Sequence, residues 1–279
     1  MKLGACVGTV TQSLSQLNLQ WAFGVGVNSM SDDFKNQAYE FVPLTFEQVP
    51  QAWWSKFLLW TNFKNFWMLG NEPCTANDGN KSPVEVARLL ADQMKFINDM
   101  YAANNLTVAP KFILTLGTQG QAPNNPYNSN VPLIESLLTA RSTVDKLIIK
   151  RNMYDNIFGF HFHYYPRWRS DNDAVRWDVQ EFVNHANGCR DWIETWNSGV
   201  FAGKKLWCSE LGFEGYFEGD PRPAQYLTAV LPKLNGCLDR FAFYVASGRV
   251  GPDGSNNYLP LLDAGGELTD LGNAWSVAV

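Results

Sequence analysis

Two glutamates stand where an apolar segment gives way to a polar, glycine-containing loop. Glu72 lies in Asn71-Glu72-Pro73, and Glu210 ends the segment Trp207-Cys208-Ser209-Glu210, far along the chain. Hydrolysis of a glycosidic bond needs one carboxyl group that protonates the leaving oxygen and a second that attacks or activates water. The pair therefore predicts glycoside hydrolysis, with Glu72 as general acid and Glu210 as nucleophile. The structural alternatives are a helix cap or surface ion pair for Glu72 and a buried carboxylate bonded to backbone amides for Glu210.

A second group of polar residues lies on one apolar segment. His161, His163 and Tyr165 alternate, so in a strand all three project to one side. An H-x-H pair could bind metal, but a catalytic zinc site needs three protein ligands, and His185, the only other histidine, falls on an expected outer helix. We therefore expect no metal and no cofactor. His163 and Tyr165 are predicted to hydrogen-bond the Glu210 carboxylate and sugar hydroxyls, and His161 to be a core residue.

Two further residues are candidates for ligand binding. Trp168 lies between two arginines in Pro166–Arg169, which suits stacking on a sugar ring better than core packing. Asn28 ends an apolar segment and is a candidate to orient a ligand hydroxyl, with a turn or helix cap as the alternative.

The elements that must position these residues alternate along the chain. Short apolar runs are separated by stretches long enough for a helix, which indicates βαβ units and a parallel sheet. The eight predicted strands are Leu3–Val7, Ala22–Val27, Glu40–Leu44, Phe66–Leu69, Lys111–Leu116, Ile157–His163, Lys205–Ser209 and Arg240–Val245. The predicted helices are one beginning at Ser82-Pro83, with Phe46–Leu59, Val131–Ile149, Asp173–Thr195, Ala224–Leu234 and Leu268–Val279.

Eight strands with eight connections predict a single (β/α)8 barrel domain over residues 1–279. The alternative, a doubly wound open sheet, needs a phosphate-binding glycine loop after the first strand, and Val7-Gly8-Thr9-Val10 is not one. Strand counting places Glu72 just after the fourth strand and Glu210 just after the seventh. Both would then lie at the C-terminal face of the barrel, where active sites of this fold are found.

Composition excludes some classes of partner. The chain has a formal net charge of −5, and no run of Lys or Arg is longer than the pair Lys204-Lys205, whereas nucleic-acid binding needs a clustered basic face. No stretch reaches the ~18 apolar residues of a membrane span. We expect neither nucleic acid nor membrane as a partner. The aromatic content of 14% provides enough Trp and Tyr to line a carbohydrate groove as well as fill a core.

Several of these motifs together resemble glycoside hydrolase family 128, in order and over nearly the whole chain. They are Glu40-Phe41-Val42-Pro43-Leu44, Leu69-Gly70-Asn71-Glu72-Pro73, His163-Tyr164-Tyr165, Trp207-Cys208-Ser209-Glu210 and Leu268-Thr269-Asp270-Leu271-Gly272. The resemblance implies a retaining β-1,3-glucanase of clan A with a (β/α)8 barrel. It also implies that Glu72 is the acid/base, Glu210 the nucleophile and Asn71 the residue that binds the sugar 2-hydroxyl.

The chain departs from the family pattern at two places. Of the Tyr-Asn-Trp common at the end of the second strand only Asn28 is present, and the eighth-strand tryptophan is replaced around Phe243-Tyr244. The alternatives are a related hydrolase acting on mannan or xylan, and a glucan-binding barrel with little turnover. By the resemblance we expect a monomer that acts on β-1,3-glucan and is secreted or associated with a cell wall. Five cysteines form no CxxC pair, and their odd number leaves at least one free or paired with another chain.

Overall fold

The structure is a computed structural model that describes residues 1–7, 14–25, 34–35, 37–45, 51–71, 83–119, 155–166, 178–199, 201–213, 219–247 and 259–278. Eight strands form a closed barrel in chain order, and β8 pairs in parallel with β1. This is the (β/α)8 fold that the sequence predicts. The strands are β1 (Lys2–Cys6), β2 (Trp21–Val25), β3 (Glu40–Thr45), β4 (Phe66–Leu69), β5 (Lys111–Gln119), β6 (Ile157–Tyr164), β7 (Lys205–Leu211) and β8 (Arg240–Phe243).

One strand boundary changes the position of a candidate catalytic residue. The predicted seventh strand ends at Ser209, but β7 continues through Leu211. Glu210 therefore lies inside the strand and not after it, which corrects the prediction. The strand extends because Leu211 resumes pairing with Phe243 of β8 beyond a shift in register.

The helices are α1 (Pro83–Ala103), α5 (Val179–Gly199), α6 (Pro221–Leu234) and α7 (Asp270–Ala278), with 3-10 helices η1 (Ser15–Leu17) and η4 (Gln51–Leu59). Of the predicted helical segment Phe46–Leu59, residues 51–59 form the 3-10 helix η4, and residues 46–50 lie outside the described residues. The predicted helix Val131–Ile149 lies outside the described residues. None of the helices in the described part of the chain is long and apolar enough to span a membrane.

The chain divides into two compact units, of which one is the continuous segment Gly24–Phe162. Its core is aromatic: the rings of Trp54 and Trp67 lie 6.0 Å apart, and both are fully buried. The indole of Trp67 donates a hydrogen bond to the hydroxyl of Tyr101 on α1 over 3.1 Å. The helix buries one apolar stripe at helical spacing, namely Val86, Leu90, Met94, Ile97 and Tyr101.

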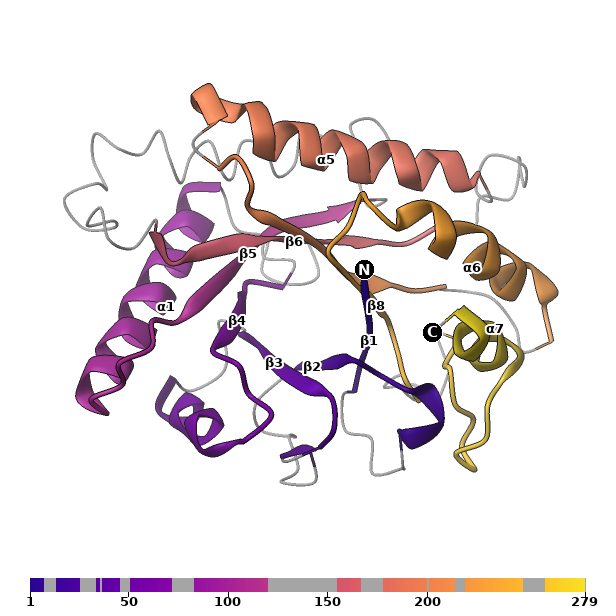
Figure 1. Cartoon of the computed structure of the whole chain (residues 1–279), viewed down its shortest axis with the longest axis horizontal. Helices are drawn as coiled ribbons and strands as arrows, with labels where there is room; N and C mark the ends of the chain where they lie inside the picture. The colour runs from indigo at the N-terminus through magenta and orange to yellow at the C-terminus, as the bar shows by residue number, and fades with distance from the viewer. Residues whose placement is uncertain are drawn as a thin grey trace. The chain divides into compact units, whose positions relative to one another are not determined.

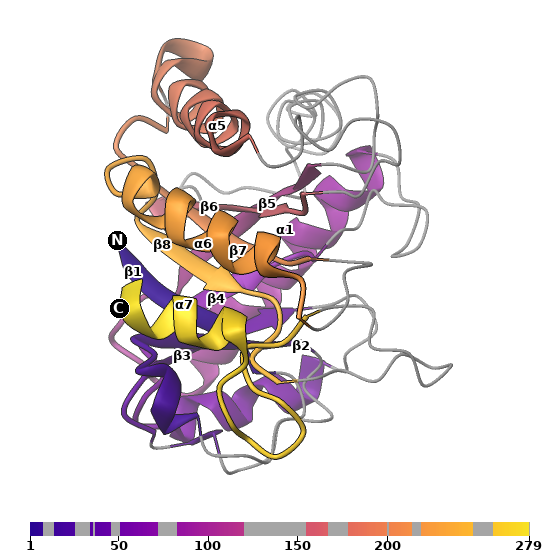
Figure 2. The same ribbon diagram turned by 90° about the vertical axis from the view of Figure 1, so that its right-hand side faces the viewer.

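The other unit consists of Met1–Phe23 and His163–Val279. In it α6 lies between α5 and α7 (Figure 1), and the same order is seen after rotation (Figure 2). The hydroxyl of Thr269 accepts a hydrogen bond from the amide of Gly272 over 3.0 Å and so caps the start of α7. The indole of Trp275 on α7 then donates to the carbonyl of Leu17 in η1 over 3.3 Å.

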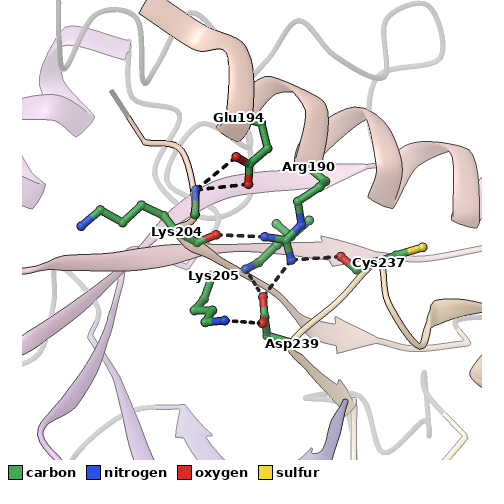
Figure 3. Close-up of polar contacts among 8 residues, drawn as sticks. Arg190, Glu194, Lys204, Lys205, Cys237 and Asp239 are labelled. Atoms are coloured by element: carbon green, nitrogen blue, oxygen red, sulfur yellow. Dashed lines mark hydrogen bonds and ion pairs between the residues drawn. The ribbon is translucent and has the colours of Figure 1, made fainter. Parts of the chain in front are cut away.

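The beginnings of β7 and β8 are joined by one carboxylate (Figure 3). Asp239 accepts from the guanidinium of Arg190 at 2.8 Å and from Lys205 at 3.0 Å, and one of its oxygens also accepts from the amide of Leu206 at 2.9 Å. Partial burial acts to raise the pKa of this carboxyl, but the hydrogen bonds from these three donors outweigh it and lower the pKa below its usual value. The register of β7 against β8 is thereby fixed at this end.

Four of the cysteines lie in the described part of the chain, and no two of these four form a disulfide with each other: Cys6, Cys189, Cys208 and Cys237.

Candidate active site

The carboxylate of Glu210 is held by two residues that come from β6 and its end. The hydroxyl of Tyr165 donates a hydrogen bond to Oε2 of Glu210, and Nδ1 of His163 lies 3.4 Å from the same oxygen. Glu210 is only 4% exposed and His163 is fully buried. A carboxyl group this far from water needs hydrogen-bonding partners, and His163 and Tyr165 provide them in an otherwise apolar surrounding.

The alternation of β6 explains why these side chains meet Glu210. Tyr164, between them in sequence, points to the opposite face and stacks on Phe182 of α5, with ring centroids 4.2 Å apart. His163 and Tyr165 therefore face away from α5. The sequence predicts this separation of faces from the alternating pattern alone.

Close backbone approach fixes the ring of Tyr165. A Cβ added at Gly212 would lie 2.6 Å from Cε1 of Tyr165, so only glycine leaves room for the ring. The ring also meets Tyr244 edge to face, with centroids 6.4 Å apart. The sequence does not predict Gly212 as a site residue, and its place two residues after Glu210 is the only signal for it.

In the unit Gly24–Phe162, the turn after β4 carries Asn71. Gly70 has φ of +75°, a left-handed conformation that other residues rarely adopt. The hydroxyl of Thr115 on β5 donates to the carbonyl of Asn71 over 3.0 Å, and Thr115 is fully buried. This bond ties the turn that leads into Glu72 to the neighbouring strand. Sequence reasoning misses Thr115 because only the pairing of β4 with β5 brings it to the turn.

Neutral groups fill the layer between β6, β7 and the helices. Burial raises the pKa of the Cys208 thiol well above its usual value, and it raises that of Cys189 on α5 to about 12. Burial also lowers the pKa of His185 on α5 to about 4. Both thiols and the imidazole are uncharged at neutral pH, so this layer is suited to packing and hydrogen bonding and not to nucleophilic chemistry.

The structure brings together three residues that the sequence singles out, Glu210, His163 and Tyr165. The catalytic candidate Glu72 and the binding candidates Asn28 and Trp168 lie outside the described residues. His161 is fully buried in β6, as expected of a core histidine. Among the residues that the structure describes, no group of three or more His, Cys, Asp or Glu side chains is arranged to hold a metal ion.

Comparison with protein-family models and with curated protein sequences finds no match. Comparison with solved structures finds barrels of similar size. One is a variant of a GH128 subgroup I endo-β-1,3-glucanase from Amycolatopsis mediterranei in complex with laminaripentaose, which is 13% identical, with a TM-score of 0.63, and covers 100% of this chain and 99% of its own.

Two further structures match over similar lengths. A GH128 subgroup III curdlan-specific exo-β-1,3-glucanase from Blastomyces gilchristii, in complex with glucose, is 18% identical, with a TM-score of 0.59 and coverage of 99% of this chain and 97% of its own. A GH128 subgroup VI exo-β-1,3-glucanase from Aureobasidium namibiae is 12% identical, with a TM-score of 0.62 and coverage of 99% and 95%.

These comparisons show the fold. At such low identity a shared barrel is compatible with many activities, so the function must be argued from the site.

Proposed function

We propose that this chain is a member of glycoside hydrolase family 128 and a retaining β-1,3-glucanase that cleaves laminarin-type glucan. The observation that carries the proposal is the buried carboxylate of Glu210 near the end of β7, bonded by Tyr165 and approached by His163. The likeness over the full chain to several β-1,3-glucanase structures supports the choice of substrate.

The surroundings of Glu210 suit a nucleophile. A nucleophilic carboxylate must be ionised and must present one oxygen to the anomeric carbon. The phenol of Tyr165 donates to Oε2, which favours the charged form and fixes the rotation of the carboxylate. Oε1 is then the oxygen that we assign to attack.

The reaction proceeds in two displacements. In the first, Glu210 forms a bond to the anomeric carbon, the bond to the glycosidic oxygen breaks, and Glu72 gives its proton to that oxygen. In the second, Glu72 takes a proton from water, the water oxygen bonds to the anomeric carbon, and the ester to Glu210 breaks. Both carboxyl groups return to their starting state, and no metal or cofactor takes part.

Asn71 directly precedes Glu72, and its turn is tied to β5 by Thr115. We assign Asn71 to the 2-hydroxyl of the sugar at the cleavage point. Asn28, His163, Tyr165 and Trp168 are assigned to binding of the glucan. We further propose that the protein acts as a monomer, is secreted or associated with a cell wall, and has neither nucleic acid nor membrane as a partner.

The direct test is incubation of the purified protein with laminarin, xylan and mannan, followed by measurement of new reducing ends. We expect release from laminarin, and no release by Glu210→Gln under the same conditions. Release from xylan or mannan alone would replace β-1,3-glucan with that glycan. Binding of laminarin without release by the unmodified protein would favour the glucan-binding alternative.

The stereochemical course is tested separately. Proton NMR during the first turnovers should show the β-anomer, as expected of two carboxyl groups about 5–5.5 Å apart. First appearance of the α-anomer would contradict a covalent intermediate on Glu210.

A further inference from the structure

Between two paired positions, the strand that carries Glu210, β7, contains one residue more than its neighbour β8. Cys208 pairs with Phe241 and Leu211 pairs with Phe243, so three steps along β7 match two steps along β8. Such an extra residue defines a β-bulge, which reorients the side chain next to it. The bulge therefore falls at Ser209 and Glu210.

The bulge cannot relax by sliding of the strand as a whole. Asp239 fixes the start of β7 through Leu206 and Lys205 (Figure 3), and the amide of Tyr244 donates to the carbonyl of Leu211 over 2.8 Å just beyond the bulge. With the register set on both sides, the extra residue must be accommodated between them.

The bulge changes the face to which Glu210 points. The Cys208 thiol lies on the side of the helices, close enough to Cys189 of α5 for that thiol to help raise the Cys208 pKa, and close enough to Tyr226 of α6 to help raise the pKa of that phenol. In a regular strand, residues two apart share a face, so Glu210 would also point toward α5. Glu210 instead contacts Tyr165 and His163, which face away from α5.

The thiol of Cys208 makes the contact that closes the bulge. Its sulfur lies 3.4 Å from the backbone carbonyl oxygen of Glu210, and both groups are buried. Burial keeps the thiol protonated, so it is the donor. A carbonyl at a bulge departs from regular strand pairing and, when buried, must find a donor.

We propose that Cys208 is a positioning residue for the nucleophile: by donating to the carbonyl of Glu210 it fixes the bulge that turns the carboxylate toward Tyr165 and His163. The link to catalysis rests on the proposed function, whereas the bulge and its hydrogen bond do not. Cys208 takes no part in the chemistry itself, since its side chain lies on the opposite face of the strand.

The test compares three variants. Cys208→Ala removes the donor, Cys208→Ser keeps a donor on the same carbon, and Cys189→Ala removes a neighbouring thiol in the same layer that has no hydrogen bond to Glu210. On laminarin, Cys208→Ala should lower kcat about tenfold, with KM changed less than about twofold, as loss of a weak hydrogen bond at the nucleophile would do. Cys208→Ser should recover most of that loss, and Cys189→Ala should leave kcat within about twofold.

Two measurements do not depend on activity. The infrared S–H stretching band that disappears in Cys208→Ser should lie below the frequency of a thiol that makes no hydrogen bond, because a donating thiol has a weakened S–H bond. The Cys189 band is not this reference, since its sulfur lies 3.6 Å from Nε2 of His185. A crystal structure of Cys208→Ala should show a longer separation between the Tyr165 hydroxyl and the Glu210 carboxylate. Cys208→Ser serves as the folded reference if Cys208→Ala does not fold.

The outcomes separate the two proposals. An unmodified protein that is inactive on every glycan, with the shifted S–H band present, overturns the proposed function and leaves the bulge contact standing. An active protein in which Cys208→Ala keeps its kcat, or in which Cys189→Ala loses as much, overturns the positioning role. An S–H band with no shift overturns the hydrogen bond itself.

Discussion

The hydroxyl of Tyr165 donates to the carboxylate of Glu210 across 45 residues of sequence. Both side chains come from the ends of neighbouring strands, β6 and β7, and the ring of Tyr165 is confined by Gly212 and Tyr244. The bond therefore has a fixed direction, and it fixes the orientation of the Glu210 carboxylate.

Removal of this donor should slow the reaction without unfolding the protein. In Tyr165→Phe the ring keeps its packing and only the hydroxyl is lost. Hydrogen bonds to charged groups contribute about 1.5–3 kcal/mol, so kcat/KM on laminarin should fall about 10- to 100-fold. Tyr164→Phe is the matched control, because it removes a phenol from the adjacent residue on the opposite face. Equal loss in both variants would argue against a specific role for Tyr165.

The division of labour between the glutamates predicts a substrate-dependent defect. Glu72→Gln should lower kcat on laminarin by about 10²–10⁴-fold, because the leaving alcohol needs a proton. An aryl glucoside with a good leaving group should still form the covalent intermediate, and added azide should then restore turnover and yield the β-glucosyl azide. Glu210→Gln should be inactive on both substrates and should not respond to azide. Near-normal activity of Glu72→Gln on laminarin would show that Glu72 is not the acid.

The turn at Asn71 should depend on a hydroxyl from the neighbouring strand. Thr115→Val keeps the shape of the side chain but loses the bond to the carbonyl of Asn71, which should cost about 1 kcal/mol of stability and lower kcat. Thr45→Val removes another buried hydroxyl, which bonds the carbonyl of Met68 over 3.2 Å, and should lower stability alone. Urea unfolding and laminarin kinetics separate the two effects. An unchanged kcat in Thr115→Val would remove Thr115 from the positioning of the turn.

The free energy of unfolding should decrease as the pH falls, because the buried His185 takes up a proton more readily in the unfolded chain than in the folded one. Burial lowers its pKa to about 4, below the ordinary value of about 6.5, so between these values the unfolded chain binds a proton that the folded chain does not. The free energy of unfolding therefore keeps its full value above pH about 6.5 and decreases as the pH falls from there to about 4. The pKa shift of His185 corresponds to a decrease of about 3 kcal/mol in the free energy of unfolding over this range.

Urea unfolding at a series of pH values between 4 and 7 measures this effect. Other groups also titrate in acid, so the informative quantity is the difference between the unmodified protein and His185→Gln. The free energy of unfolding of the unmodified protein minus that of His185→Gln should decrease as the pH falls from 6.5 to 4. A difference that stays constant over this range would contradict the role of His185.

The barrel could be predicted from the sequence because its strands are short, apolar and separated by helix-length segments. The shared face of His163 and Tyr165 follows from alternation along β6, but their contact with Glu210 also depends on the bulge that turns Glu210 to that face. The extent of β7 could not be predicted, since the bulge at Glu210 exists only relative to the residues of β8.

Three residues of the candidate site cannot be predicted from the sequence, because their roles depend on contacts that only the folded chain brings about. Gly212 matters because the Tyr165 ring approaches it, and Thr115 because β5 lies beside the turn at Asn71. Cys208 reads as an ordinary apolar strand residue until its sulfur is placed against the carbonyl of Glu210. The roles of Glu72, Asn28 and Trp168 stay predictions.

The pairing of β1 with β8 has a consequence for synthesis on the ribosome. Lys2 pairs with Arg240, so β1 emerges before the other strands of the barrel but meets one of its two neighbours only when β8 has been made. At about 5–20 residues per second this interval is on the order of tens of seconds. Gly24–Phe162 is meanwhile complete and continuous, and can begin to fold while β1 still has an open edge. The nascent chain is therefore most exposed to aggregation through the open edge of β1.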